Sequence, residues 1–236
     1  MDFENELIPG VLIKRYKRFF VDIKLKNKTI TAHCPNSGSM FNLLKRGNPV
    51  WFTESKNEKR KLKYTLQIIE VEGVKFCVNT HITNKVIKEA LQNKLIQDLK
   101  KYELVRAEKK FGKNTRFDFF LADTKHNKKV FLEVKSVSLC RKKGHAEFPD
   151  AVTERGKKHL ENLILAKQQG YESYLIFLIQ IERCKSFNIA SDIDPGYFKV
   201  LKEALNKKVN VLCYNCKFSN KGIDINNKID FFLDDR

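Results

Sequence analysis

The chain has 236 residues, of which 42% are hydrophobic and 18 are phenylalanine, so a packed core is expected and global disorder is disfavoured. Its 46 Lys and Arg residues outnumber its 28 Asp and Glu residues, which gives a formal net charge of +18. A surface of that sign attracts polyanions, and nucleic acid is the commonest such partner because its phosphates release counterions on binding. The alternative is biased codon usage, since Lys, Asn and Ile are abundant throughout.

The cysteines and the N-terminus indicate the compartment. The six cysteines are scattered along the chain, and MDFENELIPG lacks the basic and apolar regions of a signal peptide. No apolar run reaches the ~18 residues of a membrane span. We therefore expect a cytoplasmic protein with free thiols and no membrane contact. Cys213 and Cys216 form a lone CxxC without a second pair at zinc-ribbon spacing, so core thiols are favoured over a metal site.

Short alternating segments separated by turns fill the first part of the chain. They lie at 19–25, 29–33, 50–53, 64–71 and 74–79, and Gly, Pro and Asn residues punctuate the stretches between them. About five short strands within roughly 70 residues predict a small β-barrel, of which the OB-fold is the nucleic-acid-binding example. We assign this OB-like domain to residues 1–83.

Two groups of cations in this domain are interleaved with aromatic rings. The first contains Lys14, Arg15, Lys17 and Arg18 beside Tyr16, Phe19 and Phe20, and the second contains Lys56, Lys59, Arg60, Lys61 and Lys63 beside Tyr64. Such a pattern is typical of a groove in which cations follow phosphates while rings stack on unpaired bases. The alternative is that Phe19 and Phe20 are core residues and the lysines are only solvated. The small-residue loop at 35–39 either holds an anion through its backbone N–H groups or is a structural turn.

From residue 84 onward, helical and extended patterns alternate. Segment 84–98 places one apolar face on a helix, made by Val86, Ile87, Ala90, Leu91 and Leu95. Strands are expected at 102–111, 116–122, 130–137, 171–181 and 209–214, and further helices at 151–169 and 197–208. Segment 171–181 is too apolar for a surface strand and predicts a central one. The order αβββαβαβ predicts an α/β domain with a mixed central sheet over 84–236, which makes the whole an α+β two-domain protein. The tail from residue 217 has no assigned place.

The strands at 116–122 and 130–137 form a hairpin that carries two acids and a lysine. Strand alternation puts Glu133 and Lys135 on one face, and pairing Leu121 with Val130 sets Asp118 across from Glu133, with Cβ atoms ~5 Å apart. Two carboxylates that close repel each other unless a cation or proton lies between them, and oxygen ligands suit Mg²⁺ or Mn²⁺. The same alternation predicts three core-facing residues: Phe117, Phe119 and Leu121.

This constellation suits metal-assisted phosphodiester hydrolysis. Lys135 would polarise the attacking water or offset charge on the phosphorane. Glu108 on the preceding strand is the candidate for a third metal-binding and catalytic carboxylate, and Glu89 and Glu103 compete with it. The alternative is a solvated strand face on which Glu133 and Lys135 form an ordinary surface pair.

The hairpin resembles the core of the PD-(D/E)xK nuclease superfamily. Along nearly its whole length the chain also resembles the sugar fermentation stimulation protein A family, in ordered blocks that include TAHCPNSGSM, EKKFGKNTRFDF, EVKSVSL and AEFPDAVTERGKKHL. The resemblance implies an OB-like domain, a nuclease-like domain, DNA binding and a role in regulating sugar metabolism. Thr115, Phe117, Ser136 and Ser138 depart from the usual residues of these blocks, but neither acid nor the lysine of the hairpin is lost.

In the predicted helix after the hairpin, Arg155, His159 and Asn162 form one stripe at i, i+4 and i+7, while Leu160, Leu163 and Ile164 lie on its core side. Nuclease-like folds use this helix to hold phosphate or the attacking water, so Arg155 and His159 are candidates for that role. A partly exposed surface histidine is the alternative. Asp150 is a candidate cap of the helix together with Thr153.

Three functions are compatible with these features. The first is a Mg²⁺- or Mn²⁺-dependent nuclease whose β-barrel binds the substrate, and the second is a DNA-binding regulator on a nuclease scaffold. Retention of Asp118, Glu133 and Lys135 together favours the first, because a binding protein has no chemical need for all three. An RNA partner is the third, since no feature here distinguishes a 2′-hydroxyl. A monomer and a homodimer both stay open.

Overall fold

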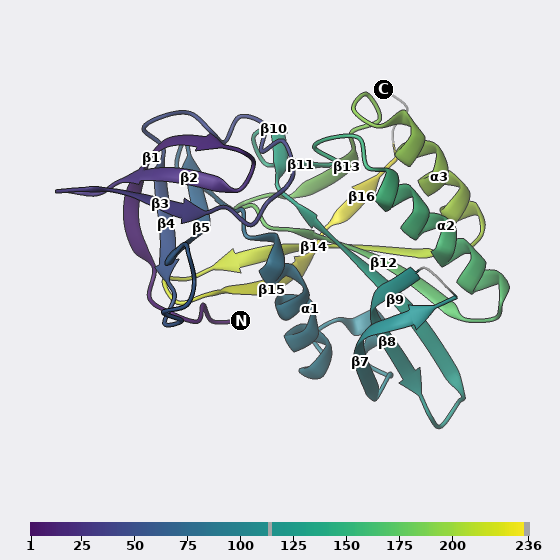
Figure 1. The fold of residues 1–236 in the computed structure, drawn as a ribbon. Coiled ribbons are helices and arrows are strands. Elements are labelled where there is room, and N and C mark those ends of the chain that lie inside the picture. Colours follow the sequence, from purple (N-terminus) through teal and green to yellow (C-terminus); the bar gives the residue numbers. More distant parts are fainter. Residues whose placement is uncertain (113–114, 234–236) are drawn as a thin grey trace.

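The first third of the chain folds into a closed β-barrel (Figure 1). The structure is a computed structural model that describes residues 1–112 and 115–233. The barrel strands are β1 (Ile8–Tyr16), β2 (Phe20–Lys24), β3 (Thr29–His33), β4 (Pro49–Glu54), β5 (Tyr64–Val71) and β6 (Val74–Cys77). Their order is β3-β2-β1-β4-β5-β6, and parallel pairing of β3 with β5 closes the first five into a barrel. The predicted OB-like barrel is confirmed, with β1 as a strand that the alternation did not reveal.

The barrel interior is filled by every second residue of its strands. In β2, Val21 and Ile23 are fully buried, as are Ala32 of β3 and Phe52 of β4, because successive strand residues face opposite sides. Phe19 does not belong to this core: its side chain is 42% exposed. Phe20 is only half-buried and stacks on Tyr16. The aromatic rings of the first basic group therefore lie at the surface.

The rest of the chain is built on a six-stranded mixed sheet. Its order is β15-β14-β12-β9-β8-β7, and β12 runs parallel to both β9 and β14 while the outer pairs are antiparallel. The strands are β7 (Leu104–Phe111), β8 (Thr115–Asp123), β9 (Lys128–Val137), β12 (Glu172–Ile179), β14 (Asn210–Phe218) and β15 (Ile223–Lys228). The predicted mixed sheet is confirmed, and the apolar segment at 171–181 is one of its two central strands.

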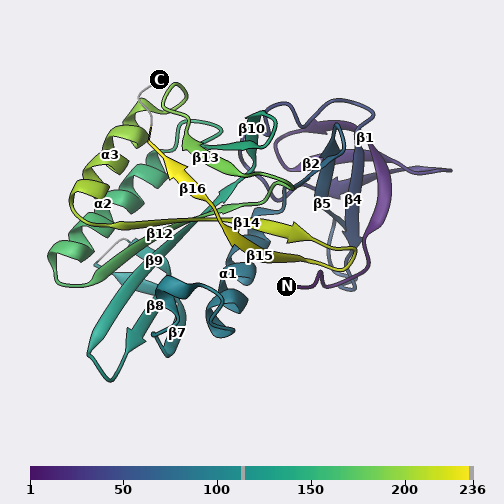
Figure 2. The ribbon, with the colours of Figure 1, turned by 180° about the vertical axis from the view of Figure 1, so that it is seen from behind.

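Helices cover both faces of this sheet. They are α1 (Thr83–Gln92), α2 (Glu154–Gln168) and α3 (Pro195–Asn206), with short 3₁₀ turns at Thr80–Ile82 and Gln97–Leu99. In β12, Leu175 and Phe177 join the core under α2 and α3, whereas Ile176 and Leu178 join the core under α1. Figures 1 and 2 show α2 and α3 side by side on one side of the sheet and α1 on the other. Burial on both faces explains why this strand is continuously apolar.

A second, smaller sheet was not predicted. It contains β10 (Leu139–Lys142), β11 (His145–Phe148), β13 (Ser186–Ile189) and β16 (Asp230–Phe232), in the order β10-β11-β13-β16. The unassigned tail thus supplies β15 to the large sheet and β16 to the small one. Residues 234–236, also part of that tail, lie outside the described residues. No helix within 1–112 or 115–233 is long and apolar enough to cross a membrane.

Three local predictions are corrected. The helix predicted at 84–98 ends at Gln92, so Leu95 falls beyond it and is 52% exposed. Phe117 is buried, yet it packs on Phe131 in the core under α2 rather than beside Phe119. Asp150 does not cap α2, because its carboxylate accepts a hydrogen bond from the Met40 N–H at 3.2 Å. Thr153 alone caps α2 with its side chain.

Barrel and sheet are joined through backbone and side-chain contacts. The Cys77 N–H donates to the Gln180 carbonyl at 2.9 Å, and the Glu182 N–H donates to the Lys75 carbonyl at 2.9 Å, so β6 runs along the end of β12. On the other side, Asp150 lies so close to Gly38 that a Cβ there would meet its carboxylate at 2.3 Å. A side chain at position 38 would therefore have to displace the Asp150 carboxylate. These links hold the barrel beside the carboxyl end of β12.

Asp194 links two helix starts, and its loss is expected to destabilise the fold. One carboxylate oxygen accepts from the Tyr197 N–H and caps α3, and the other accepts from the Thr153 N–H ahead of α2, both at 2.8 Å. Asp194→Ala leaves one buried and one partly buried N–H group unpaired and should lower the free energy of unfolding by about 2 kcal/mol, measured by urea denaturation. Asp194→Asn keeps one acceptor and should lose about half as much. Equal losses in the two variants would contradict this account.

Candidate functional site

The predicted register of the hairpin is present in the structure. Leu121 pairs with Val130, as predicted. Toward Asp118, the hydrogen-bonded ladder between β8 and β9 ends at the pair of Phe119 and Leu132. Asp118 lies just beyond that end, so the predicted pairing of Asp118 directly across from Glu133 is not part of the ladder. Its Oδ2 accepts a hydrogen bond from the Val134 N–H at 2.8 Å, and its Oδ1 accepts one from Asn84 Nδ2 at 2.7 Å. Asp118 is therefore held between β9 and the first turn of α1, and Asn84 is a site residue for which the sequence had no signal.

Glu133 is the most enclosed member of the site, with 3% of its surface exposed. Its Oε1 accepts from Lys135 Nζ at 2.8 Å and from His159 Nδ1. Its Oε2 is buried without any hydrogen-bond partner. An ionised oxygen that is buried and unpaired is costly, so this atom marks a place where a further donor or cation stabilises the protein.

The two carboxylates have opposite pKa shifts. Burial raises the pKa of Asp118, and the neighbouring charge of Glu133 raises it further. Burial also acts to raise the pKa of Glu133, but Lys135 and His159 outweigh it and hold that pKa below its ordinary value. Glu133 is thus a stable anion, and Asp118 is an acid whose charge is disfavoured by its neighbour. A cation between them relieves that repulsion.

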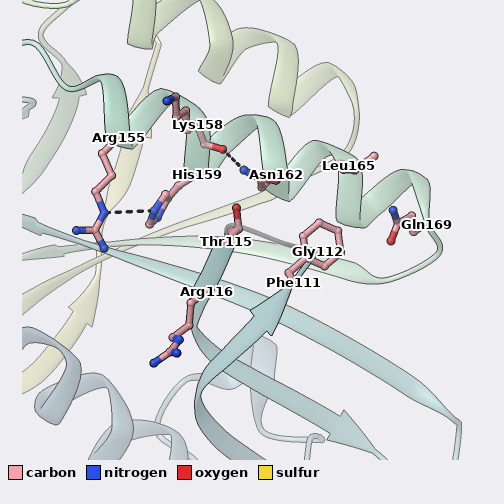
Figure 3. Close-up of a pocket in the computed structure, with 10 residues that line it drawn as sticks. All are labelled: Phe111, Gly112, Thr115, Arg116, Arg155, Lys158, His159, Asn162, Leu165 and Gln169. Atoms are coloured by element: carbon pink, nitrogen blue, oxygen red, sulfur yellow. Dashed lines mark hydrogen bonds between the residues drawn. The ribbon is translucent and has the colours of Figure 1, made fainter.

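His159 is fixed between two partners on the stripe predicted for α2. Arg155 Nε donates to His159 Nε2 at 3.4 Å, which makes Nε2 the acceptor (Figure 3). Nδ1 then carries the proton and donates it to Glu133. The imidazole is therefore oriented by Arg155 on one side and Glu133 on the other, and it connects the acid pair to the surface.

A groove of about 890 Å³ opens beside His159. It runs between the start of β8 and one side of α2, as Figure 3 shows, and its lining includes the cations Arg116, Arg155 and Lys158. Lys158 was not singled out from the sequence, although its spacing of three from Arg155 puts it on the same helical stripe. The groove offers positive charge directly next to the acid pair.

The structure brings only two of the candidate carboxylates together. Ala107 pairs with Phe119 and Lys109 with Phe117, so the backbone of Glu108 lies opposite that of Asp118. The exposed side chain of Glu108, however, forms an ion pair with Arg116 at 2.8 Å. Glu89 pairs with the N-terminal amine, and Glu103 accepts from Thr124. Within the described part of the chain, no three His, Cys, Asp or Glu residues form a group that could hold a metal ion. A third carboxylate ligand from Glu108 stays a prediction.

The predicted cations of the barrel have different surroundings. Arg15 donates to the carbonyls of Asn36, Gly38 and Arg18, and so holds the loop at 35–39 as a structural turn. Lys14 lies over the ring of Tyr16, with its ammonium 5.3 Å from the ring centroid. The remaining predicted binding residues of the barrel are exposed in the loops before β2 and before β5: Lys17, Arg18, Lys59, Arg60 and Lys61.

Comparisons with known proteins place the chain in a family. The model of the "SfsA N-terminal OB domain" matches residues 13–78, and that of the "Sugar fermentation stimulation protein RE domain" matches residues 81–222. The chain belongs to the sugar fermentation stimulation protein family. A homolog from Pelagibacter ubique is 49% identical and covers 97% of this chain and 98% of its own. A second, from Pseudoalteromonas atlantica, is 42% identical over 99% of this chain and 100% of its own.

One solved structure shares the whole fold of this family member. The SfsA of Pyrococcus furiosus, solved in complex with Ca²⁺, superposes with a TM-score of 0.88 and covers 98% of each chain at 22% identity. At that identity the likeness establishes the fold. The resemblance to the sugar fermentation stimulation protein A family expected from the sequence is confirmed.

Proposed function

We propose that this protein hydrolyses phosphodiester bonds of DNA with a divalent cation held by Asp118 and Glu133. The observation that carries the proposal is the buried, unpartnered Oε2 of Glu133 beside a second carboxylate whose pKa is raised. A pair of carboxylates in that state is suited to a hard cation with oxygen ligands. The Pyrococcus furiosus relative was solved in complex with Ca²⁺, a cation of that class.

The side chains around the acid pair have complementary roles in this reaction. A bound Mg²⁺ or Mn²⁺ supplies Lewis-acid stabilisation and a water of lowered pKa. Lys135, whose ammonium is 2.8 Å from Glu133, places a fixed positive charge where negative charge develops on the phosphate. His159, held by Arg155, orients Glu133 through its Nδ1–H.

The groove beside the site is the proposed path of the DNA backbone. Arg155 points from α2 into it, Lys158 lines it from the same helix and Arg116 lies across from them, and guanidinium groups suit bidentate contact with phosphate. The net charge of +18 favours encounter with a polyanion in the same way. We further propose a cytoplasmic location, in keeping with six free cysteines.

A DNA-binding regulator with an idle site is the second candidate. The observation that favours it is that Glu133 accepts hydrogen bonds from Lys135 and His159, which stabilise the anion without any metal. Such a protein would bind DNA through the groove and leave it intact. The two candidates differ in one measurable property, the cleavage of DNA.

Metal removal separates them. The purified chain is incubated with single-stranded and duplex DNA and RNA in Mg²⁺, Mn²⁺ or EDTA, beside the Asp118→Ala/Glu133→Ala variant. We expect cleavage of DNA in either metal, none in EDTA, and none by the variant, because the variant lacks both metal-binding carboxylates. Intact substrates in every metal, together with DNA binding by both proteins, would refute hydrolysis and favour the regulator.

A further inference from the structure

Three aromatic rings, two of them exposed and one half-buried, form a row between the barrel and the start of α1. The ring centroids of Phe19 and His33 are 6.3 Å apart, and those of His33 and His81 are also 6.3 Å apart. Phe19 precedes β2, His33 ends β3 and His81 lies in the 3₁₀ turn before α1. Phe19 and His81 are exposed and His33 is half-buried. We call these three residues the aromatic track.

Cations lie beside the aromatic track. A cavity of about 350 Å³ is lined by His33 and His81 together with Arg60 and Lys85. Burial, Arg60 and His81 lower the pKa of His33, so its ring is neutral at pH 7 and presents an uncharged aromatic face. Lys85 pairs with Glu4 at 2.6 Å, but both side chains are exposed, and exposed ion pairs are weak. A phosphate can therefore replace Glu4 at little cost.

The last residue of the aromatic track lies close in the chain to a residue that contacts the acid pair. His81 stands three residues before Asn84, whose side-chain amide donates to Asp118. Lys85, on the cavity, directly follows Asn84 in α1. The first turn of α1 thus places Lys85, which lines the cavity beside the track, next in the chain to Asn84, which holds the candidate catalytic carboxylate.

We propose that the aromatic track binds a single strand of DNA, with its bases stacked on Phe19, His33 and His81 and its phosphates beside Arg60 and Lys85. Rings in a row with cations alongside recognise unpaired bases, because only an unpaired base leaves a face free for stacking. A duplex keeps its bases stacked inside and offers the rings nothing. The direction of the strand toward Asp118 rests on the proposed function, whereas the binding of the strand does not.

The test measures binding in EDTA, so that cleavage plays no part. Fluorescence anisotropy compares labelled oligo(dT), an abasic strand of equal length and a duplex at fixed ionic strength. Wild type should bind oligo(dT) about tenfold more tightly than the abasic strand, which has the same phosphates but no bases to stack. His33→Ala/His81→Ala should lose that preference and bind both strands alike.

Two further variants separate stacking from folding. Phe19→Trp keeps an aromatic ring and should keep the preference for oligo(dT), while Phe19→Ala should weaken it several-fold. Phe232→Ala removes a ring of similar exposure, 48%, on the distant strand β16 and should change nothing. The proposal is overturned if wild type binds the abasic strand or the duplex as tightly as oligo(dT), or if Phe19→Ala keeps the full preference. If wild type prefers oligo(dT) to the abasic strand but does not cleave DNA in Mg²⁺ or Mn²⁺, only the proposed hydrolysis is refuted.

Discussion

Replacing Glu133 by glutamine is expected to reduce DNA cleavage by about three orders of magnitude, as loss of a major electrostatic contact in an active site does. The substitution keeps the size of a side chain that is 3% exposed, so the packing under α2 is preserved. It removes the anion that Lys135 and His159 hold, and with it one of the two charges that attract a divalent cation. Cleavage rates at saturating Mg²⁺ and Ca²⁺ binding by calorimetry should fall together.

Replacing Lys135 by methionine separates catalysis from metal binding. The Lys135 ammonium forms an ion pair with Oε1 of Glu133 at 2.8 Å, so it competes with a divalent cation for that oxygen. Lys135→Met should lower cleavage by about two orders of magnitude, yet leave Ca²⁺ binding equal or tighter. If Ca²⁺ binding fell as much as in Glu133→Gln, Lys135 would have to support the metal site instead. Cleavage at the wild-type rate would exclude it from the reaction.

Truncating Phe131 to alanine is expected to lower the free energy of unfolding by about 3–5 kcal/mol, the range for a buried phenylalanine. Phe131 is the centre of an aromatic cluster, with ring centroids 4.9 Å from Tyr171, 5.0 Å from Phe111 and 5.1 Å from Phe117. The cluster fixes β9 two residues before Glu133, so alanine leaves a cavity under the strand that carries the site. Urea denaturation followed by circular dichroism measures the loss.

Phe131→Leu is the matched control for that cavity. Leucine fills much of the space with apolar atoms and should lose less than half of the stability that alanine loses. Phe232→Ala, at a surface ring, should change stability by less than about 0.5 kcal/mol. A loss at Phe131→Ala as small as that at Phe232→Ala would mean that the cluster does not support β9.

Local sequence patterns correctly predicted the position of a side chain wherever that position depends on a single strand or a single helix. The period of two in β8 and β9 set Asp118 near Glu133, and the period of 3.6 in α2 aligned Arg155 with His159. The same reasoning failed at Leu95, where the chain leaves the helix after Gln92 and an apolar residue is left exposed. It failed again at Phe117, which packs on the other face of the sheet once β8 parts from β9.

The barrel, the mixed sheet and the acid pair with its lysine could be predicted from the sequence, because the pairing of neighbouring strands and the alternation of side chains are local properties. Tertiary structure alone decided that His159 reaches Glu133, that Asn84 holds Asp118, and that Glu108 pairs with Arg116. Those contacts depend on how α1, α2 and β7 pack around the hairpin. His159 and Glu133 are 26 residues apart, and Asn84 and Asp118 are 34 apart. Such pairs meet only when helices and strands bury apolar surface against one another, and no local sequence pattern predicts that packing.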